Sequence, residues 1–188
     1  RICARQSECR PANHSGNHPA RHHRSCASVG QRRRARGMLT NTDIAELTAF
    51  RRQLHRHPEL SGQETETAAT ITAALQALSP TSIASGLGGH GVAAIFDSGQ
   101  AGPTVLFRAE LDALPIVEKS GVAWTSCVPG MAHLCGHDGH MTMLMALARL
   151  VKRHPVESGR IILMFQPAEE DGSGARAVVA DPRYDEMA

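Results

Sequence analysis

The chain has 188 residues, of which 41% are hydrophobic and 3% aromatic, and its formal net charge is +2. This length allows one globular domain with an aliphatic core. No apolar run approaches the roughly 18 residues of a membrane span, so we predict no membrane partner. Residues 1–37 hold nine arginines and one acid, which leaves 11 basic and 17 acidic side chains in residues 38–188. Because this main part is acidic, we also predict no nucleic-acid partner.

Residues 1–37 form a basic head without aromatic residues or apolar periodicity. Such a composition cannot bury enough surface to order itself, so we expect this segment to be disordered. The favoured interpretation is upstream, non-native translation, because well-patterned sequence begins directly after Met38. The alternatives are a transit peptide and a nucleic-acid-binding arm formed by the arginines of residues 32–36.

Two helices are predicted at the start of the patterned sequence. The first runs from a cap at Asn41 or Thr42 to about His57, where a proline follows. Its apolar stripe consists of Ile44, Leu47, Phe50 and Leu54. The second helix opens with a capping-box pattern at Ser61–Glu64. We interpret His55 as structural, since the C-terminus of a helix favours a cation.

Strands and helices alternate in the rest of the chain. A Gly-rich segment, 85–91, leads into a strand at 92–96, and a second strand covers 104–109. After a loop at 121–130, an apolar helix at 141–151 precedes a central strand at 161–165, and helical pattern returns near 175–180. This order predicts an α/β fold with a largely parallel mixed sheet flanked by helices.

A thiol and an imidazole are two residues apart in the segment 133–140. In an extended segment, side chains at i and i+2 point the same way, so Cys135 and His137 can reach one metal ion. From spacing alone, a buried structural role for both is the alternative. Asp138 can orient a ligand imidazole or cap the following helix. The flanking His133 and His140 are candidates for lining the pocket.

Carboxylates follow two of the predicted strands. Glu169 and Glu170 come after the strand 161–165, and Glu110 and Asp112 close the strand 104–109. Functional sites in open α/β sheets gather at the carboxyl ends of strands. Of two adjacent carboxylates on non-helical backbone, one can bind a metal while the other acts as general base toward a water. A solvated acidic loop is the alternative in both places.

Four ordered motifs carry a resemblance to a known family. They are LHRHPEL at 54–60, FRAELDALP at 107–115, HLCGHDGH at 133–140 and FQPAEE at 165–170. With these motifs the chain resembles the M20 metallopeptidase family over about residues 42–181. The resemblance is closest to its amidohydrolase branch, which includes hippurate hydrolases, N-acyl-amino-acid amidohydrolases and auxin-conjugate hydrolases.

The resemblance implies a zinc-exopeptidase-like catalytic domain with two divalent metal ions, of which residues 38–188 would be the N-terminal part. Cys135, His137 and Glu170 would be metal ligands. Glu169 would be the general base and Asp112 a supporting acid. Manganese, zinc, cobalt and nickel are all compatible with such ligands. The substrates would be N-acyl amino acids such as hippurate, and a homodimer is an option for the full-length protein.

The chain departs from the family in ways that set further expectations. Glu110 stands where the motif usually has Asp. Family members are much longer, with two more histidine ligands and an inserted dimerisation domain, and we expect this chain to end before them and to be weakly active or inactive. The alternatives are a non-catalytic metal-binding fragment and a hydrolase with Cys135 as nucleophile. Because Cys127 and Cys135 do not suggest a disulfide scaffold, we predict a cytoplasmic location.

Overall fold

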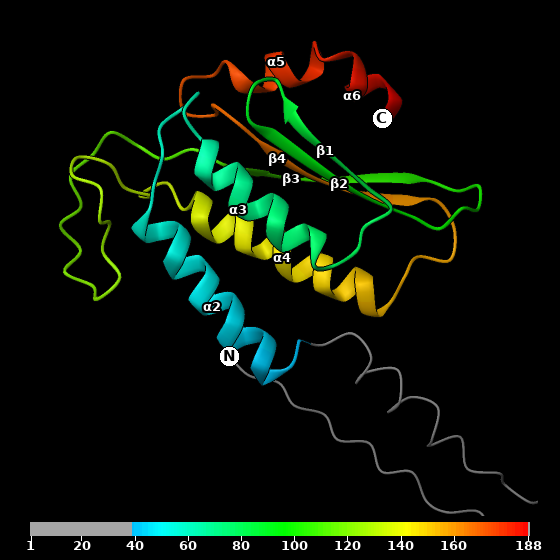
Figure 1. Cartoon of the computed structure of the whole chain (residues 1–188), viewed down its shortest axis with the longest axis horizontal. Coiled ribbons are helices and arrows are strands. Elements are labelled where there is room, and N and C mark those ends of the chain that lie inside the picture. Colours follow the sequence, from blue (N-terminus) through cyan, green and yellow to red (C-terminus); the bar gives the residue numbers. More distant parts are fainter. Residues whose placement is uncertain (1–38, 188) are drawn as a thin grey trace, which may run out of the picture.

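The computed structural model describes residues 39–187. The basic head, residues 1–37, lies outside this range, so the predictions made for it stay predictions. In the described part, no helix is long and apolar enough to cross a membrane. The elements in chain order (Figure 1) are α2 (Asn41–Arg56), α3 (Thr65–Gln76), β1 (Ser82–Leu87), β2 (Gly91–Asp97), β3 (Thr104–Glu110), α4 (His137–Arg153), β4 (Arg160–Gln166), α5 (Gly174–Val179) and α6 (Pro182–Met187).

The four strands form one mixed sheet with the order β1-β2-β4-β3. β1 pairs with β2 and β2 with β4 in antiparallel fashion, whereas β3 and β4 are parallel. The predicted α/β class with a mixed sheet flanked by helices is confirmed. The expected excess of parallel strands is not found in these four strands, because β2 is antiparallel to both of its neighbours, β1 and β4. The short connection between β1 and β2 can join only antiparallel neighbours.

β1 was not among the predicted strands. The Gly-rich segment 85–91 is expected only to lead into the strand at 92–96, whereas β1 extends to Leu87. Its sequence, SIASGL, has small and polar side chains and no clear alternation, so it carries little signal of its own. β1 is held in place by pairing with β2, where Ile83 lies opposite Ala94. Tertiary pairing therefore decides this element rather than local preference.

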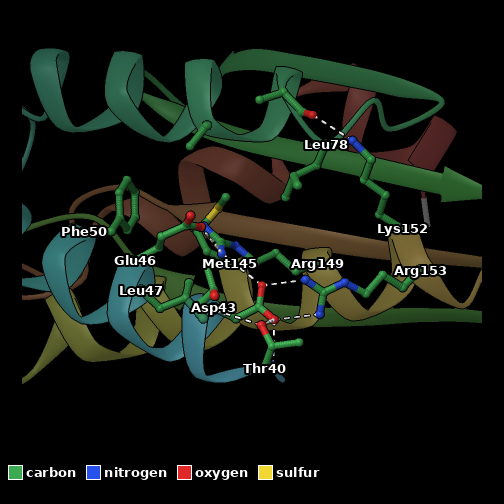
Figure 2. Close-up of a pocket in the computed structure, with 13 residues that line it drawn as sticks. Thr40, Asp43, Glu46, Leu47, Phe50, Leu78, Met145, Arg149, Lys152 and Arg153 are labelled. Carbon is green, nitrogen blue, oxygen red and sulfur yellow. Dashed lines mark hydrogen bonds and ion pairs between the residues drawn. The ribbon is translucent and has the colours of Figure 1, made fainter. Parts of the chain in front are cut away.

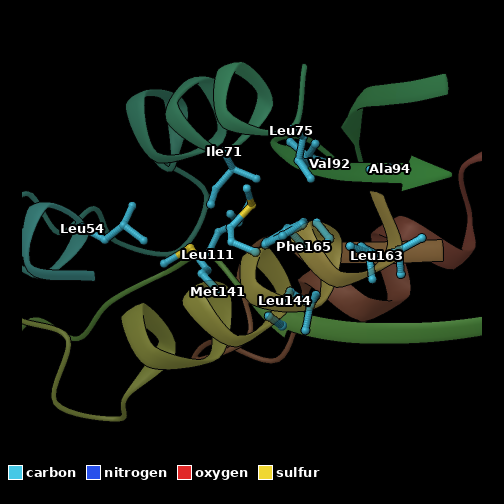
Figure 3. Packing of buried hydrophobic residues seen from close by; sticks show 14 of the residues in the cluster. Leu54, Ile71, Leu75, Val92, Ala94, Leu111, Met141, Leu144, Leu163 and Phe165 are labelled. Atoms are coloured by element: carbon cyan, nitrogen blue, oxygen red, sulfur yellow. The ribbon is translucent and has the colours of Figure 1, made fainter. Parts of the chain in front are cut away.

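Alternate residues of the central strands face two different helical layers. On one face, side chains from β2 and β4 pack with those of α2, α3 and α4, as Figure 3 shows. Their labelled members include Ile71, Leu75, Val92, Ala94, Met141, Leu144, Leu163 and Phe165. On the other face, Ile162 and Met164 pack with Val178 of α5 and Met187 of α6. The central strands β2 and β4 are thus covered on both sides (Figure 1).

α2 begins with a capping box one residue earlier than predicted. The Thr40 side chain accepts from the backbone N–H of Asp43, whose carboxylate accepts from the Thr40 N–H in return. The expected helix end near His57 is confirmed, since His57 is the C-cap. Of the predicted stripe, Leu47 and Leu54 are buried, but Ile44 is exposed, since the first turn of α2 turns Asp43 rather than Ile44 to the interior.

β3 lies at the edge of the sheet, and only its end is buried. Val105, Leu106 and Phe107 are exposed, whereas Ala109 and Glu110 are buried. The strand therefore carries its carboxyl end, and the acids that follow it, from the molecular surface into the interior.

Candidate metal centre

The carboxyl ends of β3 and β4 and the N-terminus of α4 meet at one edge of the sheet. Glu110 closes β3 opposite Gln166, which closes β4. The N–H of Leu111 extends this pairing by donating to the Gln166 carbonyl at 2.8 Å. Because these two strands are parallel, the acids that follow each of them come to the same edge. The acids that follow β3, Glu110 and Asp112, therefore lie at the same edge as Glu169 and Glu170, which follow β4.

His137 lies at the centre of these acids. It is the first residue of α4 and follows Gly136, whose φ of +98° belongs to a conformation that L side chains rarely adopt. Its Nδ1 lies 2.8 Å from the backbone carbonyl oxygen of Asp112. Its Nε2 lies 4.0, 3.6 and 3.7 Å from the nearest carboxylate oxygens of Glu110, Glu169 and Glu170. The ring is thus anchored through one nitrogen while the other faces the acids.

The same acids change the charge state of His137. Burial of the ring opposes protonation, but the nearby carboxylate of Asp112, the hydrogen bond to its backbone oxygen and the negative charge of Glu110 raise the pKa of His137 to about 9. In the absence of another cation, the imidazole therefore serves as the counterion of the cluster. A divalent ion would compete with that proton for Nε2.

Cys135 and Glu170 complete a group of three possible metal ligands. The thiol sulfur, a ring nitrogen of His137 and a carboxylate oxygen of Glu170 all lie within 4.8 Å of one another. The expected extended backbone at 135–137 is wrong, because α4 starts at His137 and the turn at Gly136 brings the two side chains together. The buried Oε1 of Glu170 has no hydrogen-bond partner. A thiol, an imidazole and an unpaired carboxylate oxygen fit a zinc-like divalent cation.

Asp112 holds several parts of this arrangement together. Its Oδ2 accepts from the Ser61 hydroxyl at 2.7 Å and from the backbone N–H of Glu170 at 2.9 Å, while its Oδ1 lies 3.5 Å from Nδ1 of His137. The side chain is fully buried, which raises the pKa of its carboxyl, but these hydrogen bonds outweigh burial and hold it well below the usual range. Asp112 is therefore an ionised anchor between the β3 loop, the β4 loop and His137.

Glu110 joins a second group of possible ligands with His137 and His140. Its Oε2 lies 2.8 Å from Nδ1 of His140, and its Oε1 lies 2.8 Å from a guanidinium nitrogen of Arg108. The longer side chain that stands here in place of Asp is thus fixed at both oxygens. Of the two positions predicted to line the pocket, His140 does face the cluster.

Glu169 and Glu170 leave β4 through a constrained turn. Ala168 has a φ of +47°, a conformation that is uncommon for a residue with a side chain. Its N–H donates to Oε1 of the fully buried Glu64 at 2.7 Å. This bond from the start of α3 fixes the backbone directly before the two glutamates. The Glu169 side chain is about one-third exposed, whereas that of Glu170 is less so.

Behind His137, Asp138 is completely buried and connects α4 to α2. Its Oδ2 lies 2.9 Å from both Nε of Arg51 and Nδ1 of His55. His133, also buried, has no hydrogen-bond partner at either ring nitrogen, and burial lowers its pKa to about 4. Asp138, which was predicted to orient a ligand imidazole, therefore supports the start of α4. His133, which was a candidate for lining the pocket, is neutral and lies buried beneath the site rather than in an open pocket.

The capping-box prediction at Ser61–Glu64 is wrong, and the reason concerns the site. α3 begins only at Thr65, so both residues precede the helix and their side chains bond to Asp112 and Ala168 instead. The helix is capped by Glu59, which accepts from the N–H groups of its first turn. Sequence reasoning missed Ser61 and Glu64 as parts of the site, and their position directly after the motif 54–60 was the only signal.

A second charged region lies away from this edge, in a groove of about 680 Å³ between α2, α3 and α4. Figure 2 shows Asp43 on its wall, joined to Arg149 and Arg153. Because these groups neutralise one another and also bond to Thr40, the region joins the start of α2 to the end of α4. It contains none of the predicted site residues.

Comparisons with known proteins bear on what this edge does. The model of the Peptidase family M20/M25/M40 matches residues 106–188. The chain is 41% identical over 145 residues to N-acetyl-L-cysteine deacetylase of Bacillus subtilis (strain 168), covering 74% of the chain and 34% of that protein. It is 41% identical over 134 residues to IAA-amino acid hydrolase ILR1-like 5 of Arabidopsis thaliana, covering 71% and 30%. The chain thus spans about a third of the length of these relatives.

Among solved structures, the chain is similar to that of the Bacillus subtilis YXEP protein, described as a dinuclear metal binding peptidase from the M20 family. The TM-score is 0.70 with 37% sequence identity, and the match covers 75% of this chain and 40% of the other.

Proposed function

Because this chain belongs to the M20 peptidase family, we propose that it is the N-terminal part of the catalytic domain of a metal-dependent amidohydrolase. The reaction would be hydrolysis of the amide bond of N-acyl amino acids of the hippurate type. The observation that carries the proposal is the group formed by Cys135, His137 and Glu170, with the carboxylate of Glu169 3.6 Å from the same imidazole. A set of side chains that can ligate a metal therefore lies beside the carboxylate of Glu169, which can act as a base.

In this proposal Cys135, His137 and Glu170 hold a divalent cation, either manganese, zinc, cobalt or nickel, and the whole protein holds two. When bound, the cation supplies Lewis acidity, which makes a water more acidic and polarises a carbonyl. Asp112 fixes the His137 ring by accepting from Nδ1 at its backbone oxygen, so that Nε2 stays available. A bound cation would also give the unpaired Oε1 of Glu170 a partner.

Glu169 is the proposed general base. It takes the proton of the attacking water and returns it to the leaving nitrogen, so that the amide yields a carboxylate and a free amino acid. Its side chain is more exposed than those of the proposed ligands His137 and Glu170, as a group that must reach a substrate requires. Glu110 and His140 form an adjacent pair that lines the same edge.

A cysteine nucleophile is the less favoured mechanism. A hydrogen bond to Glu170, together with the negative charge of Glu170, Glu169 and Glu110, raises the pKa of the exposed Cys135 thiol. A reactive cysteine instead needs an electropositive setting that lowers its pKa. The acidic surroundings therefore support a thiolate that is paired with a cation.

The substrate class, a homodimer of the full-length protein and a cytoplasmic location belong to the same proposal. The relatives' names support hydrolysis of acylated amino acids and amino acid conjugates. We expect this chain by itself to be weakly active or inactive, since it spans only about a third of the length of its relatives. If the chain binds one ion but shows no turnover, this result would support the alternative of a non-catalytic metal-binding fragment.

The test is to measure metal content together with hydrolysis of hippurate and N-acetyl amino acids. The chain, Cys135→Ala and Glu170→Ala would be assayed in parallel, with Cys127→Ala as the matched thiol control. We expect one to two ions in the unchanged chain and in the control, and none in the two site variants. A folded chain without metal would contradict the assignment. Thiol alkylation that abolishes turnover, combined with indifference to chelators, would favour the nucleophile.

A further inference from the structure

The loop 115–131 is attached to the C-terminal half of α2 by three different contacts. The guanidinium carbon of Arg52 lies 4.0 Å from the ring centroid of Trp124. The N–H of Cys127 donates to the Arg56 carbonyl at 2.8 Å. The third contact joins Nε2 of His55 to Oε1 of Glu118 at 3.2 Å. The loop is therefore docked on one helical face, although it has no regular secondary structure.

Glu118 organises the inner part of this loop. Its side chain is only 3% exposed. The Ser120 hydroxyl donates to one of its oxygens, and the N–H of Ser126 donates to the other at 2.8 Å. These bonds, with a smaller contribution from His55, lower the pKa of Glu118 to about 2. The carboxylate thus ties the loop to itself and, through His55, to α2.

His55 connects this loop to the candidate metal centre. While its Nε2 faces Glu118, its Nδ1 lies 2.9 Å from Oδ2 of Asp138. Asp138 is fully buried in the first turn of α4, directly after His137. A displacement of the loop therefore alters the support of the backbone that carries the His137 ring.

We propose that metal binding at Cys135, His137 and Glu170 is coupled to docking of the loop 115–131 on α2. The coupling acts through the series Glu118, His55 and Asp138, which makes Glu118 and His55 positioning residues for the centre. The inference rests on the proposed function, because it requires that the centre binds a metal. Coupling of this kind is reciprocal: an ion that selects one placement of His137 also favours the docked loop.

The chain carries its own probe for the test. Trp124 is its only tryptophan and lies in the docked loop against Arg52. Its fluorescence and its quenching by acrylamide therefore report docking. Co²⁺ titration, followed by the thiolate-to-cobalt absorption of Cys135, reports occupancy of the centre independently. Zn²⁺ serves for the fluorescence titration, because its filled d shell gives no absorption of its own.

The variant Glu118→Ala removes the loop's link to His55, and the exposed Glu157→Ala is the matched control. We expect Zn²⁺ to reduce the quenching of Trp124 in the unchanged chain and in the control. In Glu118→Ala, quenching should increase, its response to Zn²⁺ should vanish, and Co²⁺ affinity should fall about tenfold. The Co²⁺ absorption at saturation should persist, since the ligands are intact. Glu118→Gln, which keeps two polar atoms, should give quenching and Co²⁺ affinity between those of the unchanged chain and of Glu118→Ala.

If Glu118→Ala releases the loop but leaves Co²⁺ affinity within about twofold, the contacts are merely structural and the coupling is refuted. If Glu118→Ala does not fold, Arg52→Ala takes its place, because it loosens the loop at an exposed contact and should weaken Co²⁺ binding in the same direction. Absence of Co²⁺ binding in the unchanged, folded chain would overturn the metal centre itself and the coupling with it. Intact binding with an unresponsive Trp124 would overturn only the coupling.

Discussion

Two clusters of charge in residues 39–187 differ in whether their charges are satisfied. At the start of α2, both carboxylate oxygens of Asp43 bond to guanidinium groups, at 2.6 and 2.7 Å from Arg153 and 3.1 Å from Arg149, and Thr40 adds further donors. At the edge of the sheet, three glutamates lie within 4.0 Å of a single imidazole, that of His137. One oxygen of Asp112 and one of Glu170 are buried without a donor.

This difference separates a structural cluster from a binding site. Charges that neutralise one another inside the chain stabilise the packing of two helices and require no ligand. An excess of buried carboxylates is costly unless another cation joins them, so the second cluster is suited to binding rather than to stability. The predictions below test that division, beginning with the largest effect.

His137→Ala should give the largest effect, a loss of metal affinity at the edge of the sheet. It removes the imidazole shared by both groups of possible ligands, so we expect Co²⁺ or Zn²⁺ affinity to fall at least about 100-fold. Isothermal titration measures the change. The exposed His154 provides the matched variant, His154→Ala, which should bind as the unchanged chain does. Equal loss in both variants would show that binding is not located at this edge.

Asp43→Ala should act on stability alone. It breaks the ion pairs with Arg149 and Arg153 and the capping box of α2 together, which should lower the melting temperature by roughly 5 °C. Metal affinity should not change, since the groove lies away from the centre. Glu46→Ala is the control, because its exposed ion pair with Arg149 contributes little. A loss of metal affinity in Asp43→Ala would contradict the division.

The stabilising effect of Asp43 should weaken progressively in acid. Its hydrogen bonds with Arg153 and Thr40 hold the pKa of this carboxyl well below its usual 3.8. A depressed pKa in the folded state means that the contribution is present above the unfolded value and is lost as pH falls below it. The difference in melting temperature between the unchanged chain and Asp43→Asn should therefore be constant near neutral pH and narrow below about pH 4. Thermal unfolding from pH 7 to pH 3 checks this.

Glu170→Gln should change the melting temperature of the metal-free chain only slightly, and in the opposite direction to Asp43→Ala. Removing one negative charge from the cluster relieves repulsion among neighbouring carboxylates, so the melting temperature should stay the same or rise by about 1–2 °C. The stabilisation that Zn²⁺ gives the unchanged chain should be lost. Thermal unfolding with and without Zn²⁺ measures both. A marked drop for the metal-free variant would place Glu170 with the structural cluster.

Much of the site follows from the order of a few residues along the chain. The apolar strand before Glu169 and the strand that ends at Glu110 place acids at two strand ends, and parallel pairing makes these ends neighbours. The spacing of Cys135 and His137 indicates a metal, although the backbone between them is a turn into a helix rather than an extended segment. Amphipathic periodicity predicts α2 and α4, because burial of one face governs both.

Contacts between distant segments follow from no local pattern. The sequence by itself determined which chemical groups are available, since strand ends and helix faces depend on local preference and burial. Only the tertiary structure decided that Ser61 and Glu64 bond to Asp112 and Ala168 rather than cap a helix, and that His55 joins Asp138 to Glu118. These bonds span 51 to 104 residues of sequence. A side chain's partner over such a distance depends on how the helices pack against the sheet, and packing is a property of the whole core.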